Sequence, residues 1–284
     1  MHPDIVSLGP FHIRSYGLML AFGFLSGIIL AARRAKKTGE NPDHIYNIAV
    51  WGVIFSLIGA RLSYVITHYS EFGAPEETSG IMRMLVEMRN MFWPVGSDGQ
   101  VGISGLIYYG GLILATAAAV VYIRSHRLNL PKYLDILAPS IPLGEAFTRI
   151  GCFLNGCCFG VPTDSVFGVV FPDSCAAGSI FEGQPIHPAQ LYNSFAALLI
   201  MGLILWLERY KRFDGYSAAL FFVLYPAARF FTDFFRYYET EMKIDGLSLN
   251  QILSVMVFIA ASSVFIYLVR TSGADHSRPV RRGG

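Results

Sequence analysis

Residues 15–37 read SYGLMLAFGFLSGIILAARRAKK, an uncharged stretch that ends in four basic side chains. An apolar run of about this length crosses a bilayer as a helix. The composition agrees: 53% of the 284 residues are hydrophobic and only 15% are charged, with a mean hydropathy of +0.46. Soluble domains carry about 25% charged residues. These values exclude a water-soluble domain, a nucleic-acid-binding protein and a disordered chain, and they predict an integral membrane protein.

Six further stretches resemble the first in length and apolar character. We therefore predict an all-α membrane protein that forms a single domain over 1–284. Its seven spans are expected near 15–32, 45–69, 105–123, 133–154, 190–207, 216–236 and 247–269. The long connectors are 70–104 and 156–188. Part of the first, 81–91, is typical of an amphipathic helix that lies in the membrane interface.

The basic residues indicate the orientation of these spans. Most of the 22 Lys and Arg residues follow the first, third, fifth and seventh spans. Cytoplasmic connectors carry such an excess of positive charge. The sequence therefore predicts an N-terminus outside, a cytoplasmic C-terminus, and both long connectors on the outer side.

Several spans carry charged side chains at membrane depth, where an ionised group costs about 2.5 kcal/mol or more and usually marks a functional site. With the predicted orientation, these groups and nearby polar side chains all lie toward the outer leaflet. They are Arg61, Arg149, Arg229, Asp233 and Arg236, joined by Tyr16, Tyr108, Tyr109 and His187. Their convergence predicts one polar site at this depth.

The spacing of the charges supports this interpretation. Arg229, Asp233 and Arg236 share one helical face, and Glu145 precedes Arg149 by one turn. Arginine binds phosphate oxygens with two parallel hydrogen bonds, so these side chains favour an anionic lipid headgroup. The competing interpretation is that boundary arginines such as Arg236 reach toward the interface only as anchors. The tyrosines could likewise belong to an ordinary aromatic belt.

The four cysteines lie at or beyond the outer end of the fourth span. Cys175 could form a disulfide with Cys157 or Cys158, because an outer compartment permits oxidation. A metal site is a weaker match, since the C-x4-C-C spacing contains no CxxC pair. Cys152 is most simply a small buried filler. The pair Gly23 and Gly27 indicates close helix packing.

Six sequence blocks, in order along nearly the whole chain, resemble the bacterial prolipoprotein diacylglyceryl transferase family. They are RSYGLM at 14–19, GARLSY at 59–64, YGGL at 109–112, RIGCFLNG at 149–156, HPAQLY at 187–192 and RFFTDFFR at 229–236. The fourth block is the most specific. The resemblance implies a multi-pass protein of the bacterial inner membrane with its active site toward the outer leaflet.

The resemblance also implies a reaction. The family transfers the diacylglyceryl group of phosphatidylglycerol to the lipobox cysteine thiol of a preprolipoprotein signal peptide, and glycerol phosphate leaves. It implies no cofactor, no metal and no nucleic-acid partner. Arg149, Arg61 and Arg236 would bind the lipid phosphate, and Arg229 with Asp233 would stabilise charge on the leaving group. Supporting positions would be Tyr16, Asn155, Gly110, Gly156 and Glu145.

The chain departs from the family at several of these positions. Tyr109 stands where many members have the histidine assigned as general base, and a tyrosine with a pKa near 10 is a poor base at neutral pH. Either the arginines alone acidify the thiol, or His187 replaces the base, or the assignment is wrong. Cys152 and Cys157 replace the usual Asn and Glu, and Asp233 replaces a Glu. A transferase with another acceptor, and a lipid-binding or lipid-translocating protein without catalysis, are the alternatives.

Overall fold

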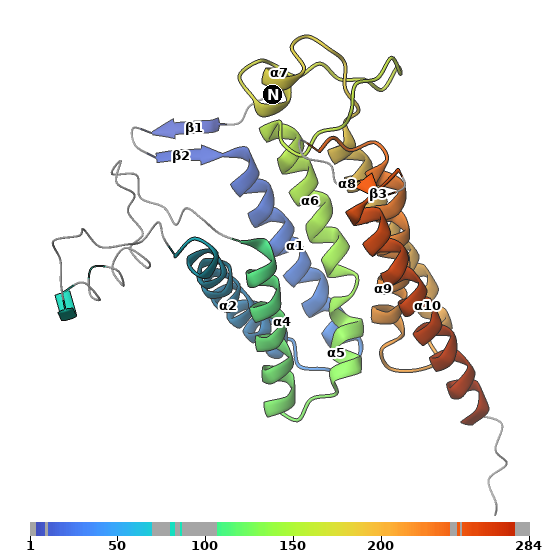
Figure 1. Cartoon of the computed structure of the whole chain (residues 1–284). Coiled ribbons are helices and arrows are strands. Elements are labelled where there is room, and N and C mark those ends of the chain that lie inside the picture. Colours follow the sequence, from blue (N-terminus) through green and yellow to red (C-terminus); the bar gives the residue numbers. More distant parts are fainter. Residues whose placement is uncertain are drawn as a thin grey trace, which may run out of the picture. The chain divides into compact units, whose positions relative to one another are not determined.

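The computed structural model describes residues 4–8, 11–69, 80–82, 86, 107–238, 243–244 and 246–275, and only the backbone of 4–14 (Figure 1). The described part is mostly helical. The chain divides into two units, one of Met1–Pro42 with Pro131–Gly284 and one of Asp43–Leu130.

The larger unit holds most of the helices. It begins with an antiparallel pair of strands, β1 (Asp4–Leu8) and β2 (Phe11–Arg14), which the sequence did not predict. Its helices are α1 (Ser15–Lys37), α5 (Leu130–Leu137), α6 (Ser140–Asn155), α7 (Ala176–Ile180), α8 (Ala189–Leu207), η2 (Glu208–Tyr210), α9 (Tyr216–Asp233) and α10 (Leu249–Asp275). The short strands β3 (Lys243–Ile244) and β4 (Leu247–Ser248) precede α10.

Small residues let α1 and α6 lie side by side (Figure 1). A Cβ built on Gly23 would stand 3.0 Å from both the Gly144 carbonyl oxygen and the Phe147 Cβ. Gly27 faces Ser140 less closely, since a Cβ built there would stand 3.5 Å from the Ser140 carbonyl oxygen. The predicted packing role of this glycine pair is confirmed, because a larger side chain at Gly23 would push the two helices apart.

The remaining helices of this unit pack in sequence, α6 on α8, α8 on α9, and α9 on α10. The Ser194 hydroxyl on α8 donates to the Ala146 carbonyl on α6 at 3.0 Å. Such a bond satisfies a polar side chain where no water is available. The connector after α6 carries a small core of its own, built around Phe159, Phe171 and Ile186.

The predicted fourth span, 133–154, is not one continuous helix. It divides into α5 and α6 at a turn formed by Ala138 and Pro139, where the helix is interrupted although Pro139 keeps right-handed helical backbone angles. Proline lacks a backbone N–H and its ring clashes with the preceding turn, so it interrupts a helix. The predicted interfacial helix at 81–91 lies mostly outside the described residues.

The smaller unit consists of α2 (Asp43–Thr67) and α4 (Tyr108–Ser125). Their backbones touch at Gly59 and Gly110, where a Cβ on either residue would overlap the carbonyl oxygen of the other. The N–H of Ile107 also donates to the Ala60 carbonyl at 3.1 Å. Gly110 is therefore a packing residue within this unit.

Four helices of the described part are long and apolar enough to cross a membrane. They are Ser15–Lys37, Asp43–Thr67, Ala189–Tyr210 and Leu249–Ser272. They coincide with the predicted first, second, fifth and seventh spans. The other three predicted spans correspond to α4, to α5 with α6, and to α9.

Candidate active site

Helix α9 ends in a buried ion pair. The Arg229 Nη2 lies 3.2 Å from the Asp233 Oδ1, and the side chains are 15% and 1% exposed. The two residues are one turn apart, as the sequence predicted. A carboxylate this deeply buried requires a charged partner and hydrogen-bond donors.

Two hydroxyl groups from beyond α9 supply those donors. The Tyr238 hydroxyl donates to Asp233 Oδ1, and the Ser248 hydroxyl donates to Oδ2. Arg229 Nη2 donates to the Tyr238 oxygen at 3.0 Å, and Arg229 Nη1 lies 3.4 Å from the Asn193 amide oxygen. Both carboxylate oxygens of Asp233 therefore accept a short hydrogen bond from a hydroxyl group. The contacts of Arg229 are longer, at 3.0 to 3.4 Å.

Tyr238 acts as a donor in this network. Burial, and then its hydrogen bond to Asp233, raise the pKa of Tyr238 above its ordinary value. The hydroxyl consequently keeps its proton at neutral pH. It links the carboxylate to the guanidinium without carrying a charge itself.

Helix α6 contributes a second arginine with its own acid. Arg149 Nη2 lies 3.3 Å from Glu145 Oε1, and the Tyr225 hydroxyl of α9 donates to the same oxygen at 3.3 Å. These separations are longer than the 2.7–2.9 Å typical of charge-assisted bonds. Glu145 thus positions Arg149 loosely.

A narrow crevice joins the two arginine–acid pairs. It lies between α6, α8 and α9, and its polar lining consists of Glu145, Asn193, Tyr225, Arg229 and Thr232. The Thr232 hydroxyl donates to the Asn193 amide oxygen at 3.0 Å. Polar groups from three helices therefore face one space, and of the predicted polar site residues Arg229 lies in its lining.

Arg236 follows α9, in a segment that pairs with the connector 156–188 through an antiparallel bridge to Gly160. Its guanidinium carbon lies 5.0 Å from the centre of the Tyr238 ring. Its Nε is buried and has no hydrogen-bond partner in the described part of the chain. A buried unpaired donor is costly, and it is a position where an external acceptor oxygen is favourable.

Arg149, Arg229 and Arg236 are connected through shared neighbours. Cys158 lies within electrostatic range of both Arg149 and Arg236, and Tyr238 lies within range of both Arg236 and Arg229. Tyr16 on α1 neighbours the same cysteine and Arg149, and its ring would contact a Cβ placed on Gly151. Arg149, Arg229, Arg236 and Tyr16 thus belong to one region.

The other predicted support residues shape the end of α6. Gly156 has a φ of 70° and ends the helix in the left-handed conformation. A Cβ at this position would overlap the Cys175 side chain. Asn155 lies near the Cys157 side chain. All four cysteines are free thiols in the structure.

His187 has an aromatic environment. Its Nδ1 lies 3.1 Å from the Tyr192 hydroxyl, and its ring meets the Phe235 ring edge-to-face at 5.0 Å between centroids. Its backbone N–H and C=O bond to Val161 and Gly160. In the described part of the chain, the side-chain contacts of His187 are with Tyr192 and Phe235 rather than with the arginines.

Three predicted site residues lie in the smaller unit. The Arg61 guanidinium carbon stands 5.8 Å from the centre of the Tyr64 ring. Tyr109 is 66% exposed, and its ring meets that of Tyr108 edge-to-face at 5.7 Å. Gly110 packs against Gly59. Their part in the site remains a prediction.

Sequence reasoning missed several polar residues of the larger unit. Tyr238, Ser248 and Asn250 come from the segment between α9 and α10 and from the first turn of α10, and the Asn250 amide donates to the Tyr238 oxygen at 3.1 Å. Asn193 and Tyr225 come from apolar helices. Asn193 could have been found from the sequence, because an amide inside an otherwise apolar span is a signal of function. Tyr238 and Ser248 carried no such signal.

Comparison with known proteins identifies the relatives of this chain. The family described as prolipoprotein diacylglyceryl transferase matches residues 3–267. A protein named phosphatidylglycerol–prolipoprotein diacylglyceryl transferase from Clostridium tetani is 31% identical over 93% of this chain and 97% of its own length. One of the same name from Campylobacter hominis is 33% identical over 96% of this chain and 94% of its own. A third, from Nitratidesulfovibrio vulgaris, is 31% identical over 90% and 89%. The chain therefore belongs to the prolipoprotein diacylglyceryl transferase family.

Proposed function

We propose that this protein transfers the diacylglyceryl group of phosphatidylglycerol to the cysteine thiol of a prolipoprotein signal peptide. Family membership over nearly the whole chain supports the reaction, as do the names of relatives that align along most of their length. The observation that carries the proposal to particular residues is the region shared by Arg149, Arg229 and Arg236.

The arginines fit the charge changes of the reaction. The acceptor sulfur, as a thiolate, forms a bond to the glyceryl carbon, the carbon–oxygen bond to phosphate breaks, and glycerol phosphate carries away the negative charge. Arg149 and Arg236 bind the phosphate in this proposal, and the unpaired buried Nε of Arg236 supports its role. Arg229, oriented by Asp233, stabilises the departing oxygens.

The acceptor thiol must lose its proton, because the thiolate is the nucleophile. The positive field of the arginines favours this loss. His187 and Tyr109 are the candidate bases, and Arg61, Tyr16, Asn155, Gly110, Gly156 and Glu145 are proposed to shape the pocket. A base can be recognised by its pH profile: its replacement removes the acidic limb of the rate profile, whereas loss of a packing residue lowers the rate at every pH.

The topology belongs to the same proposal. Seven spans place the N-terminus outside and the C-terminus in the cytoplasm, in a bacterial inner membrane, with the arginine region toward the outer leaflet. The whole chain would act as one membrane domain. Cysteine-accessibility labelling at the connectors 33–42 and 156–188 tests this orientation, since only the second should react with an impermeant reagent in intact cells.

The deciding experiment uses the full-length protein in vesicles, a lipobox peptide and mass detection of the product. The thioether should form only when phosphatidylglycerol is present, together with an equal amount of glycerol phosphate. Arg149→Ala should abolish both products. Lipid movement between leaflets without release of glycerol phosphate would contradict the transfer reaction.

A further inference from the structure

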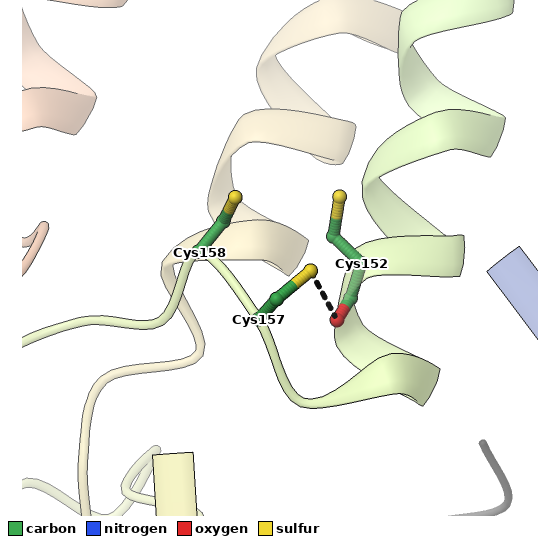
Figure 2. Close-up of side chains that lie close together, drawn as sticks. All are labelled: Cys152, Cys157 and Cys158. Carbon is green, nitrogen blue, oxygen red and sulfur yellow. Dashed lines mark hydrogen bonds between the residues drawn. The ribbon is translucent and has the colours of Figure 1, made fainter. Parts of the chain in front are cut away.

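Three thiols gather at the end of α6, beside the proposed phosphate-binding arginines. The sulfur atoms of Cys152, Cys157 and Cys158 all lie within 4.8 Å of one another. Figure 2 shows the Cys152 and Cys158 side chains projecting in the same direction, and Cys157 pointing toward the Cys152 carbonyl oxygen at 3.8 Å. The fourth cysteine, Cys175, donates to the Pro172 carbonyl at 3.1 Å and is not one of the three.

The backbone brings these thiols together by turning back on the helix. Gly156 ends α6 in the left-handed conformation, and the Cys157 N–H then donates to the Cys152 carbonyl at 3.1 Å. Cys158 follows with a φ of 58°. A non-glycine residue in this region is uncommon and costs conformational energy. The turn places two neighbouring cysteines against a third from the preceding helix.

The separation of the sulfurs suits a thiophilic cation. Zinc–thiolate bonds are about 2.3 Å long, so tetrahedral zinc separates its sulfurs by roughly 3.8 Å. The three thiols need to approach by no more than about 1 Å to reach this geometry. Side-chain rotation of two partly exposed cysteines can supply such a movement.

The surrounding charges suit thiolate ligands. Arg236 and Arg149 both lie within electrostatic range of the Cys158 side chain. Three thiolates around a divalent ion carry a net charge of −1, which the two guanidinium groups can balance. Three neutral thiols without an ion would carry no charge, so the cluster would then not offset the positive charge of the two arginines.

We propose that Cys152, Cys157 and Cys158 bind Zn²⁺ through three thiolates, with the fourth coordination position open to water or to another ligand. Sites with three protein ligands and one exchangeable ligand are an established zinc arrangement. Soft sulfur donors select Zn²⁺ or Cu⁺ over harder ions. The proposal does not depend on the transfer reaction, and its test does not use activity.

The test is metal binding to the full-length protein in detergent, under reducing conditions. Co²⁺ serves as the spectroscopic probe, because tetrahedral thiolate coordination gives intense visible and charge-transfer bands. Zn²⁺ should displace it at one equivalent per chain. Ser substitutions at Cys152, Cys157 and Cys158 should each weaken binding at least tenfold, whereas Cys175→Ser should bind like the parent protein.

Three results would overturn the proposal. The first is the absence of stoichiometric Co²⁺ and Zn²⁺ binding by folded, reduced protein. The second is binding that Cys175→Ser abolishes but Cys158→Ser retains. The third is binding of Cu⁺ alone, which would assign the thiols to another ion. Thermal unfolding of each variant, measured without metal, separates loss of the site from loss of the fold.

Discussion

The larger unit holds two clusters of buried charge that differ in how fully their arginines are paired. Near the C-terminal end of α1, Arg34 donates from Nη1 and Nη2 to the two carboxylate oxygens of Glu208, both at 2.7 Å. Its Nε and Nη2 also donate to the carbonyls of Ile136 and Asp135. In the second cluster, near the C-terminal ends of α6 and α9, Arg149 lies 3.3 Å from Glu145 and Arg229 lies 3.2 Å from Asp233.

The difference separates a structural ion pair from a site prepared for an external anion. Arg34 has protein acceptors in every direction and a side chain that is 9% exposed, so it has little capacity for a ligand. Arg149 has longer contacts, and Arg236 has a buried donor without a described partner. A buried arginine does not by itself indicate function. A buried arginine with donors that lack a protein acceptor is the stronger indication of a functional site.

The largest expected effect is on catalysis at the loosely paired arginine. Arg149→Gln should lower kcat/KM by at least about 100-fold, the usual cost of removing a donor that stabilises developing charge. The thermal unfolding midpoint in detergent should fall less than in Arg34→Gln, because Arg149 meets Glu145 at 3.3 Å whereas Arg34 meets Glu208 at 2.7 Å. Arg149→Lys keeps the charge but loses the paired donors, so its kcat/KM should lie between those of the parent protein and Arg149→Gln. Parent-like kinetics for Arg149→Gln would remove Arg149 from the reaction.

The converse result is expected at Arg34. Arg34→Gln leaves the Glu208 carboxylate without its partner, and breaking a buried pair costs about 3–5 kcal/mol, with the lower end expected because Glu208 is partly exposed. Chemical unfolding should register this loss, while the activity per folded molecule stays near that of the parent. A variant that is stable but inactive would contradict a structural role.

A smaller effect is expected at Tyr238, which links Asp233 to Arg229. Tyr238→Phe removes one donor to the carboxylate and one acceptor for the guanidinium. We expect kcat to fall about tenfold, with KM for phosphatidylglycerol nearly constant, because Arg149 and Arg236 remain. Tyr237→Phe is the matched control, since its neighbouring ring stacks on Phe159 in the connector core. Equal losses in both variants would argue for a packing effect.

The smallest effect is expected at Lys211, which pairs with Asp135 beside the Arg34–Glu208 ion pair. Burial lowers its pKa, but hydrogen bonds to Asp135 and Asp214 outweigh this and raise the pKa above its ordinary value. The stabilisation is therefore complete below the unfolded-state pKa near 10.5 and is lost as the pH rises through the higher folded-state pKa. The midpoint of unfolding should therefore decrease slightly in the parent protein as the pH is raised above about 10. Lys211→Arg should remove that decline, and an unchanged decline would point to another group.

The membrane class and the central arginines could be predicted from the sequence, because apolar run lengths and misplaced charges are local signals. The four helices that are long and apolar enough to cross a membrane come from stretches of this kind. The division of 133–154 was missed, although Pro139 stands within it. The donors to Asp233 were missed because Tyr238 and Ser248 lie in polar segments where such residues are ordinary.

The cysteines show a different limit. Their spacing contains no regular metal-binding pair, and the sequence therefore favoured a filler or a disulfide. The structure instead shows free thiols brought together by a left-handed turn at Gly156 and a positive φ at Cys158. Asparagine and aspartate adopt such a conformation more readily than cysteine does. A spacing rule based on regular loops does not anticipate this arrangement.

The bond from Ser248 to Asp233 has a consequence for biosynthesis. The serine immediately precedes α10, and Asn250 in the first turn of that helix reaches Tyr238. A nascent chain that has inserted α9 still lacks both residues, so Asp233 stays without its Ser248 donor and Tyr238 without its Asn250 donor while α10 remains inside the ribosome and translocon. The protein therefore becomes competent only after its last transmembrane segment is released, and any truncation before residue 250 should yield an inserted but silent product.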